Sequence, residues 1–258
     1  MNSLLFWNCR GARKKEASLY LKEIVRDHGV CFVGLMETKL SSIDRTDVDF
    51  LIGKDWDYFH FPDVSTAGGI MVLWNSKSVS FTVERSDSQV VVGSLHTPSL
   101  GVWKVATVYS SRCNNERRIL WSMLENSLMD SGHAIVVGWG GDFNCFVGPS
   151  FTWCNNKDGS SRIWERLDKC LLNSSALQLM PFGKVKHLAR VASDHSPIVF
   201  NMDARKINRN KSFRFEDTWR SYPAAWSIVK NSWRKADFGD EEDILHTKLK
   251  RSLRALFF

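Results

Sequence analysis

The feature that most constrains the fold is a series of short apolar segments, many of which end at an acid or an amide. In the clearest, Ala134 to Val137 predict a small buried strand, and a glycine-rich turn is expected at 138–141. Asp142 and Asn144 follow, and residues at i and i+2 of a strand-like segment point to the same side. Their oxygens can therefore face one hard cation or phosphate, although an isolated Asp-x-Asn is as typical of a turn that ends a strand.

Other apolar or alternating segments predict further strands at residues 3–7, 30–36, 56–61, 70–74, 79–83, 89–95, 102–109, 151–154, 161–164, 185–191 and 198–202. Apolar residues at helical spacing predict helices at 18–28, 114–129, 223–233 and 240–256. Many strands with a few helices between them indicate an α/β (α+β) fold in which two packed β-sheets are covered by helices.

Composition and charge divide the chain near residue 203. Its 258 residues suffice for one large domain or two small ones. From residue 203 the sequence is first basic and then helical, so we predict a domain at 1–202 and a linker with a helical extension at 203–258. The net charge of +7 favours a polyanionic partner. The positive excess is concentrated at Arg205, Lys206, Arg209, Lys211 and Arg214.

Cysteine usage and hydropathy indicate the cellular compartment. The 6 cysteines are scattered, without a Cys-x-x-Cys pair or zinc-site spacing, and several lie in apolar runs, so a reducing compartment is expected. No apolar stretch approaches the ~20 residues of a membrane span. The apolar start is too short for a signal peptide. We therefore expect a nuclear or cytoplasmic protein that is neither secreted nor membrane-bound.

Polar residues that could build a catalytic site recur at the predicted strand ends, namely Asn8, Glu37, Asp142 with Asn144, Asp168, and Asp194 beside His195. Residues just beyond strand ends commonly meet at one rim of a sheet protein. Carboxylate and amide oxygens suit Mg²⁺ or Mn²⁺, and a histidine with a carboxylate can act as a general base or phosphate contact. These are the groups needed to hydrolyse a phosphodiester.

Taken singly, each of these residues has an ordinary structural explanation. Asp168 stands between Arg166 and Lys169, where it could form a surface ion pair that stabilises little. Asp194 and His195 could form a turn held by its own side-chain hydrogen bonds. The functional interpretation is favoured because the residues occur together, each at a strand end.

Seven short motifs occur in a fixed order along the chain: 7–11 (Trp-Asn-Cys-Arg-Gly), 37–39 (Glu-Thr-Lys), Tyr109, 141–144 (Gly-Asp-Phe-Asn), 151–153 (Phe-Thr-Trp), 166–168 (Arg-Leu-Asp) and 193–197 (Ser-Asp-His-Ser-Pro). Together they resemble the motifs of the endonuclease/exonuclease/phosphatase superfamily. The match is best to the apurinic-type endonuclease domain of plant LINE-type (non-LTR) retrotransposons. Residues 213–219 resemble the segment that joins this domain to a reverse transcriptase.

The resemblance implies a four-layer sandwich of two mixed β-sheets flanked by helices, which nicks double-stranded DNA with Mg²⁺ or, alternatively, Mn²⁺. By the same resemblance, Glu37 is the main metal ligand, Asn8 helps to place metal or phosphate, and Asp194 completes the metal site. Asp142 is expected to orient or deprotonate the attacking water.

The resemblance also implies which residues contact the phosphate. Asn144 and Tyr109 are expected to hold the scissile phosphate. His195 is expected to contact it while Asp168 orients the imidazole. Thr152 and Ser193 complete the implied phosphate or DNA contacts.

The sequence departs from the family pattern in three places. Only residues 145–151 separate Asn144 from Thr152, and a link of that length spans at most ~28 Å, so the family's helix at this point is predicted to be deleted. The connection before Asp142 is longer by a residue or two. Arg10 stands where the family offers an optional acidic ligand. The alternatives are therefore a degenerate, non-enzymatic relic with at most weak nucleic-acid binding, and a phosphatase acting on a small phosphoester.

Overall fold

The structure, a computed structural model, describes residues 3–62, 68–111, 113–129, 133–140, 151–157, 161–203 and 223–257. The chain divides into two compact units, Met1–Arg205 and Lys206–Phe258. Within the described residues, no helix combines the length and apolar character needed to cross a membrane.

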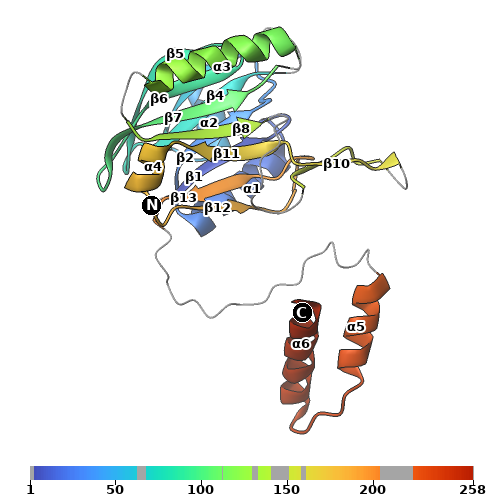
Figure 1. The fold of residues 1–258 in the computed structure, drawn as a ribbon. Coiled ribbons are helices and arrows are strands. Elements are labelled where there is room, and N and C mark those ends of the chain that lie inside the picture. The colour runs from blue at the N-terminus through green and yellow to red at the C-terminus, as the bar shows by residue number, and fades with distance from the viewer. Residues whose placement is uncertain are drawn as a thin grey trace. The chain divides into compact units, whose positions relative to one another are not determined.

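The first unit contains two large sheets (Figure 1). The six-stranded sheet has the order β12-β13-β1-β2-β4-β3, and only the β1–β2 pair is parallel. Its strands are β1 (Ser3–Asn8), β2 (Val30–Met36), β3 (Trp56–Phe61), β4 (Ile70–Asn75), β12 (Lys184–His187) and β13 (Ile198–Asn201). Strand β12 is shorter than the predicted 185–191.

The five-stranded sheet has the order β11-β8-β7-β6-β5, with β7 and β8 parallel. Its strands are β5 (Ser80–Ser86), β6 (Val90–Thr97), β7 (Gly101–Tyr109), β8 (Ile135–Gly140) and β11 (Asp168–Leu172). A short hairpin, β9 (Trp153–Cys154) with β10 (Trp164–Glu165), forms where the sequence predicted one.

Among the described residues of the first unit, three apolar clusters hold these layers together. The central one joins the inner faces of the two sheets through residues such as Phe6, Phe32 and Trp103, all at most 1% exposed. A second cluster packs helices α1 (Lys15–His28) and α2 (Arg45–Leu51) onto the outer face of the six-stranded sheet. The third packs α3 (Asn114–Met129) onto the five-stranded sheet.

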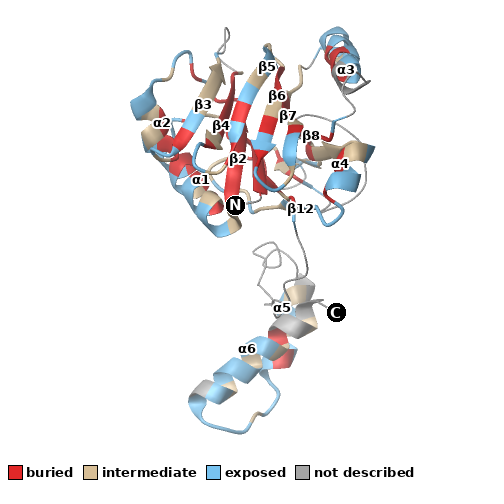
Figure 2. Cartoon of the chain, turned by 90° about the vertical axis from the view of Figure 1, so that its left-hand side faces the viewer, coloured by how far each residue is buried: buried red, intermediate tan, exposed pale blue. Residues whose placement is uncertain are grey.

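Burial follows this arrangement: β2 is buried along its length, whereas α1 and α3 are buried on one side only (Figure 2). A strand buried on both faces is expected to be a continuous apolar run, as β2 is. The predicted four-layer sandwich is thus confirmed.

The sheets approach one another closely at two glycines. A Cβ built on Gly138 would lie 1.9 Å from a ring carbon of Phe6, and one on Gly34 would lie 2.3 Å from the Thr107 hydroxyl. The predicted turn at 138–141 is therefore wrong for residues 138–140, which continue β8 and pair with β7 and β11. Gly138 is required for packing against Phe6 and does not mark a turn.

Three helices depart from the prediction, namely α1, α2 and α4 (Ser174–Leu179). Helix α1 begins at Lys15, almost one turn before the expected residue 18. Helix α2 was not predicted, because seven residues are too few for a clear periodic pattern. A signal was nevertheless present: Asp44 and Asp47 form a reciprocal capping box at its start.

Helix α4 was not predicted either. Asn173, the residue before it, caps the helix because its side chain accepts a hydrogen bond from the Ala176 N–H. The second unit contains α5 (Pro223–Trp233) and α6 (Glu241–Phe257), close to the predicted 223–233 and 240–256. Asp237, between the two helices, pairs with Arg251 at 2.5 Å and Lys248 at 3.4 Å. These pairs hold the pKa of Asp237 below its usual value.

Candidate active site

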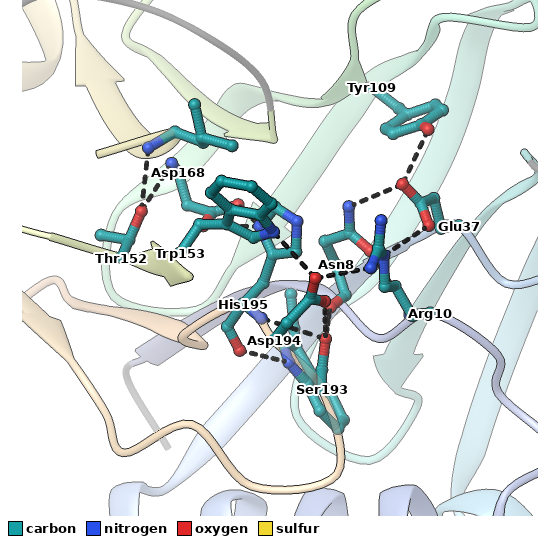
Figure 3. A network of polar contacts seen from close by, with 12 residues as sticks. Asn8, Arg10, Glu37, Tyr109, Thr152, Trp153, Asp168, Ser193, Asp194 and His195 are labelled. Carbon is teal, nitrogen blue, oxygen red and sulfur yellow. Dashed lines mark hydrogen bonds and ion pairs between the residues drawn. The ribbon is translucent and has the colours of Figure 1, made fainter. Parts of the chain in front are cut away.

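Strand ends from both sheets bring polar side chains to one place (Figure 3). Asn8 is the last residue of β1, and Glu37 directly follows the parallel strand β2. Tyr109 ends β7 in the other sheet. Since β1 and β2 run in parallel, their carboxyl ends meet at the same edge, which places Asn8 beside Glu37.

Glu37 is the centre of the first group of contacts. Its Oε1 accepts hydrogen bonds from Asn8 Nδ2 at 3.2 Å and from the Tyr109 hydroxyl at 2.8 Å. Its Oε2 accepts from Arg10 Nε at 3.3 Å. The Glu37 side chain is only 11% exposed, so these donors take the place of most of the water that would otherwise hydrate the carboxylate.

Arg10 connects Glu37 to a second acid. Its Nη1 lies 2.5 Å from Asp194 Oδ2, which also accepts from Trp153 Nε1 at 2.8 Å. Arg10 has a positive φ of 48°, a conformation that non-glycine residues rarely adopt. One guanidinium thus lies between two largely buried carboxylates.

The histidine forms a buried pair with Asp168. His195 Nδ1 lies 3.0 and 2.9 Å from the two Asp168 oxygens, and both side chains are at most 6% exposed. A carboxylate can only accept, so Nδ1 carries the proton and donates. Asp168 is itself held by Thr152, whose fully buried hydroxyl accepts from the backbone N–H of Leu167 and of Asp168, both at 3.0 Å.

Ser193 links the histidine pair to the acids. Its hydroxyl donates to the Asn8 carbonyl at 2.8 Å and accepts from the His195 N–H at 3.2 Å. Trp7 Nε1 donates to the His195 carbonyl at 3.4 Å. The strand end that carries Asn8 and the loop that carries His195 are therefore fixed to one another.

The eight predicted site residues that the structure describes lie in this one network; they are Asn8, Glu37, Tyr109, Thr152, Asp168, Ser193, Asp194 and His195. Asp142, Asn144 and the predicted deletion at 145–151 fall in or next to residues 141–150, which lie outside the described residues. The individual roles stay predictions.

The sequence did not reveal three participants: Arg10 as an ionic bridge, Trp153 as a donor to Asp194 and Trp7 as a donor to His195. Each stands within a motif, which was the available signal. Cys9 also lies here, but burial raises its thiol pKa to about 12, so it is protonated at neutral pH and is no nucleophile.

The acids are not arranged as a ready-made metal cluster. Across the described residues, no group of three or more His, Cys, Asp or Glu side chains is placed to hold a metal ion. What the geometry offers is two carboxylates sharing one positive charge, next to a hydrogen-bonded His–Asp pair. Such an arrangement can bind a cation, hold an anionic group and orient an imidazole.

Comparison with known proteins gives a match to one family. Residues 5–195 match the model of the Endonuclease/Exonuclease/phosphatase family. A search of curated proteins found no match.

Several solved structures share the fold. The endonuclease domain of TRAS1, a telomere-specific non-LTR retrotransposon, has 14% identity and a TM-score of 0.59, covering 80% of this chain and 100% of its own. D. rerio TDP2 complexed with single strand DNA product has 16% identity and a TM-score of 0.56, covering 78% and 98%. The AP endonuclease LMAP from Leishmania major has 14% identity and a TM-score of 0.53, covering 79% and 88%.

At these identities the structural likeness concerns the fold, whereas the family match spans most of the chain and contains all of the network residues described above. The chain belongs to the Endonuclease/Exonuclease/phosphatase family.

Proposed function

We propose that this protein is a metal-dependent phosphodiesterase that nicks double-stranded DNA, the endonuclease of a LINE-type (non-LTR) retrotransposon. The observation that carries the proposal is the buried His195–Asp168 pair, joined through Ser193 to the acids and amide at the strand ends. The likeness to a retrotransposon endonuclease domain and to TDP2 bound to DNA supports a nucleic-acid substrate.

Nucleases of this family generally depend on a divalent metal, and the donors here fit a hard cation in their chemistry. Glu37 and Asp194 offer carboxylate oxygens that already converge on one positive group, the Arg10 guanidinium. We assign Glu37, Asp194 and Asn8 as the residues that would hold Mg²⁺ or Mn²⁺. The metal, when bound, would polarise the phosphoryl oxygen and stabilise the leaving oxyanion.

The protein itself orients the groups around the phosphate. With Nδ1 of His195 held by Asp168, Nε2 is the ring nitrogen left to contact the phosphate. Tyr109 and Asn144 would hold the same phosphate, and Asp142 would orient or deprotonate the attacking water.

We assign positioning roles to Thr152 and Ser193. The Thr152 hydroxyl is used by two backbone N–H groups and is fully buried, so it acts on Asp168. Ser193 uses its hydroxyl to fix the backbone of His195 against Asn8. Both residues influence the phosphate through the groups that they hold.

The direct test is nicking of supercoiled plasmid DNA by the purified protein with Mg²⁺. We expect wild-type nicking to be abolished by EDTA and to fall about 100-fold or more in His195→Ala and Glu37→Gln. The matched control is Glu16→Gln, an exposed glutamate in the first turn of α1. If wild type nicks no faster than His195→Ala, the protein is a degenerate, non-enzymatic relic instead. Hydrolysis of p-nitrophenyl phosphate without nicking would identify a phosphatase.

A further inference from the structure

The guanidinium of Arg10 occupies the space between the two carboxylates that we assign to the metal. Nε lies 3.3 Å from Glu37 Oε2, and Nη1 lies 2.5 Å from Asp194 Oδ2. The two acidic side chains are 11% and 6% exposed, so they are poorly hydrated. Two such charges side by side repel unless a cation lies between them.

The backbone holds Arg10 in this place. Its N–H donates to Asn8 Oδ1 at 3.3 Å, and its φ of 48° turns the chain sharply after β1. On either side, Cys9 N–H donates to the Met36 carbonyl at 3.1 Å and Gly11 N–H to the Glu37 carbonyl at 2.8 Å. The turn that carries Arg10 is thus fastened to the segment that carries Glu37.

A metal held between these acids competes with the hydrogen-bond donors that they already accept from. Asn8 and Tyr109 use Glu37 Oε1, and Trp153 shares Asp194 Oδ2 with Arg10. Of these donors on described residues, Arg10 alone is charged, and its side chain is 39% exposed. It can move into water, where its N–H groups are hydrated at once, so it is the easiest donor to displace.

We propose that Arg10 is an internal counter-ion that competes with the divalent cation for Glu37 and Asp194 and thereby sets the metal affinity of the site. The guanidinium keeps the two carboxylates together in the metal-free protein and is released when metal binds. This inference rests on the proposed assignment of Glu37 and Asp194 as metal ligands.

The test is Mn²⁺ binding by titration calorimetry on the full chain, with no DNA present. Arg10→Gln removes the charge and keeps a polar side chain, and we expect it to bind Mn²⁺ about five- to tenfold more tightly, the factor expected for loss of two partly exposed ion pairs. Arg10→Lys keeps the charge and should bind within about twofold of wild type. Arg13→Gln is the matched control, because Arg13 lies three residues away and contacts only Asp47 and the Ser42 carbonyl among the residues described.

Wild type provides a second measurement that needs no folded variant. In the ¹⁵N NMR spectrum, the Arg10 Nε–H signal should shift as Mg²⁺ is added, whereas the Arg13 signal should stay in place.

Thermal unfolding is a third measurement, and it uses the variant. In EDTA, Arg10→Gln should unfold at a lower temperature than wild type, and saturating Mn²⁺ should remove the difference.

Equal or weaker Mn²⁺ binding by Arg10→Gln would overturn the proposal, as would tightening of the same size in Arg10→Lys or no Mn²⁺ binding by any variant. The nicking assay separates this inference from the proposed activity. Tighter Mn²⁺ binding by Arg10→Gln without nicking by wild type would support the counter-ion role and contradict the proposed activity. Nicking by wild type, together with the same Mn²⁺ dissociation constant in wild type and Arg10→Gln, would support the activity and overturn the counter-ion role.

Discussion

At the residue scale, the His195–Asp168 pair is the contact on which the proposed chemistry most depends. In Asp168→Asn the amide keeps the shape of the carboxylate but holds Nδ1–H less strongly and stabilises a positive imidazole poorly. We expect the nicking rate to fall about 100-fold while the circular dichroism spectrum stays unchanged. Asp27→Asn, on the exposed end of α1, is the control and should nick at the wild-type rate. A fall of less than threefold in Asp168→Asn would show that the imidazole needs no orienting acid.

Thr152 offers a test of how the pair is supported. Thr152→Val replaces the hydroxyl that accepts the Leu167 and Asp168 N–H groups by a methyl, leaving two donors unpaired. We expect unfolding by urea to show a loss of about 3 kcal/mol, together with slower nicking. Thr152→Ser keeps the acceptor and should lose only about 1 kcal/mol, for the missing methyl. Equal losses in both variants would mean that packing, and not the hydroxyl, is what matters.

The position of a site residue could be predicted from sequence only where it ends a recognisable strand. Asn8 and Glu37 follow such strands, so their convergence was expected, whereas Tyr109 was expected from the family resemblance alone. The Arg10–Asp194 contact joins positions 184 residues apart and depends on a positive-φ turn. Neither the turn nor the partner produces a periodic pattern in the sequence. From sequence alone, Arg10 therefore indicated only that an optional acidic metal ligand is missing.

At the element scale, β8 shows why a glycine-rich segment can be misread. The glycines at 138 and 140 suggested a turn, yet the strand continues because the Phe6 ring from the opposite sheet needs the space beside Gly138. Gly138→Ala should therefore lower the free energy of unfolding by about 3 kcal/mol, because its Cβ overlaps the ring. Adding Phe6→Leu should recover part of the loss, so the double variant is less destabilised than the sum of the single variants. Additive losses in urea unfolding would argue against this contact.

The two edge strands of the six-stranded sheet predict a pH dependence. His60 on β3 and His187 on β12 each have a buried Nε2 that finds no hydrogen-bond partner among the described residues. Burial lowers the pKa of both, and at His187 the positive charge of Arg166 lowers it further, while Asp168 opposes the shift. Below pH about 6.5 the unfolded chain then binds more protons than the folded one, so stability falls as the pH falls.

Urea unfolding between pH 7 and pH 5 measures this effect. We expect wild type to lose stability over that range, and His60→Gln with His187→Gln to flatten the profile. His96→Asn, on the exposed side of β6, is the control and should keep the wild-type profile. A double variant with the wild-type profile would place the acid sensitivity elsewhere.

At the scale of the whole molecule, the layering was predictable because each layer leaves its own pattern. The fully apolar β2 marks a strand covered on both faces, and the one-sided burial of α1 marks a helix on the outside. The sequence does not encode the pairing order as plainly, since β1 pairs with both β2 and the distant β13. That order is set by which apolar faces can be buried together, a property of the assembled sheets.

The charge distribution along the whole chain gives a last prediction. Of the five basic residues between 205 and 214, Arg205 ends the first unit, which holds the described site residues, and the other four come next in the sequence. Replacing all five by Gln should weaken binding to a labelled DNA duplex and reduce the slope of log affinity against log salt by up to about 4.5, because each phosphate contact contributes about 0.9. The stability of the first unit should not change.

A matched variant controls for net charge alone. Five exposed basic residues of the first unit can be changed to Gln instead, namely Lys14, Lys15, Arg26, Lys54 and Lys77. If the segment 205–214 contacts the DNA backbone, its variant should lose more of the salt slope than the control, since only charges that neutralise phosphates release counter-ions. DNA affinities measured by fluorescence anisotropy would give both variants the same slope of log affinity against log salt if the segment contributed only through long-range attraction. The DNA backbone would then be contacted by other residues of the chain.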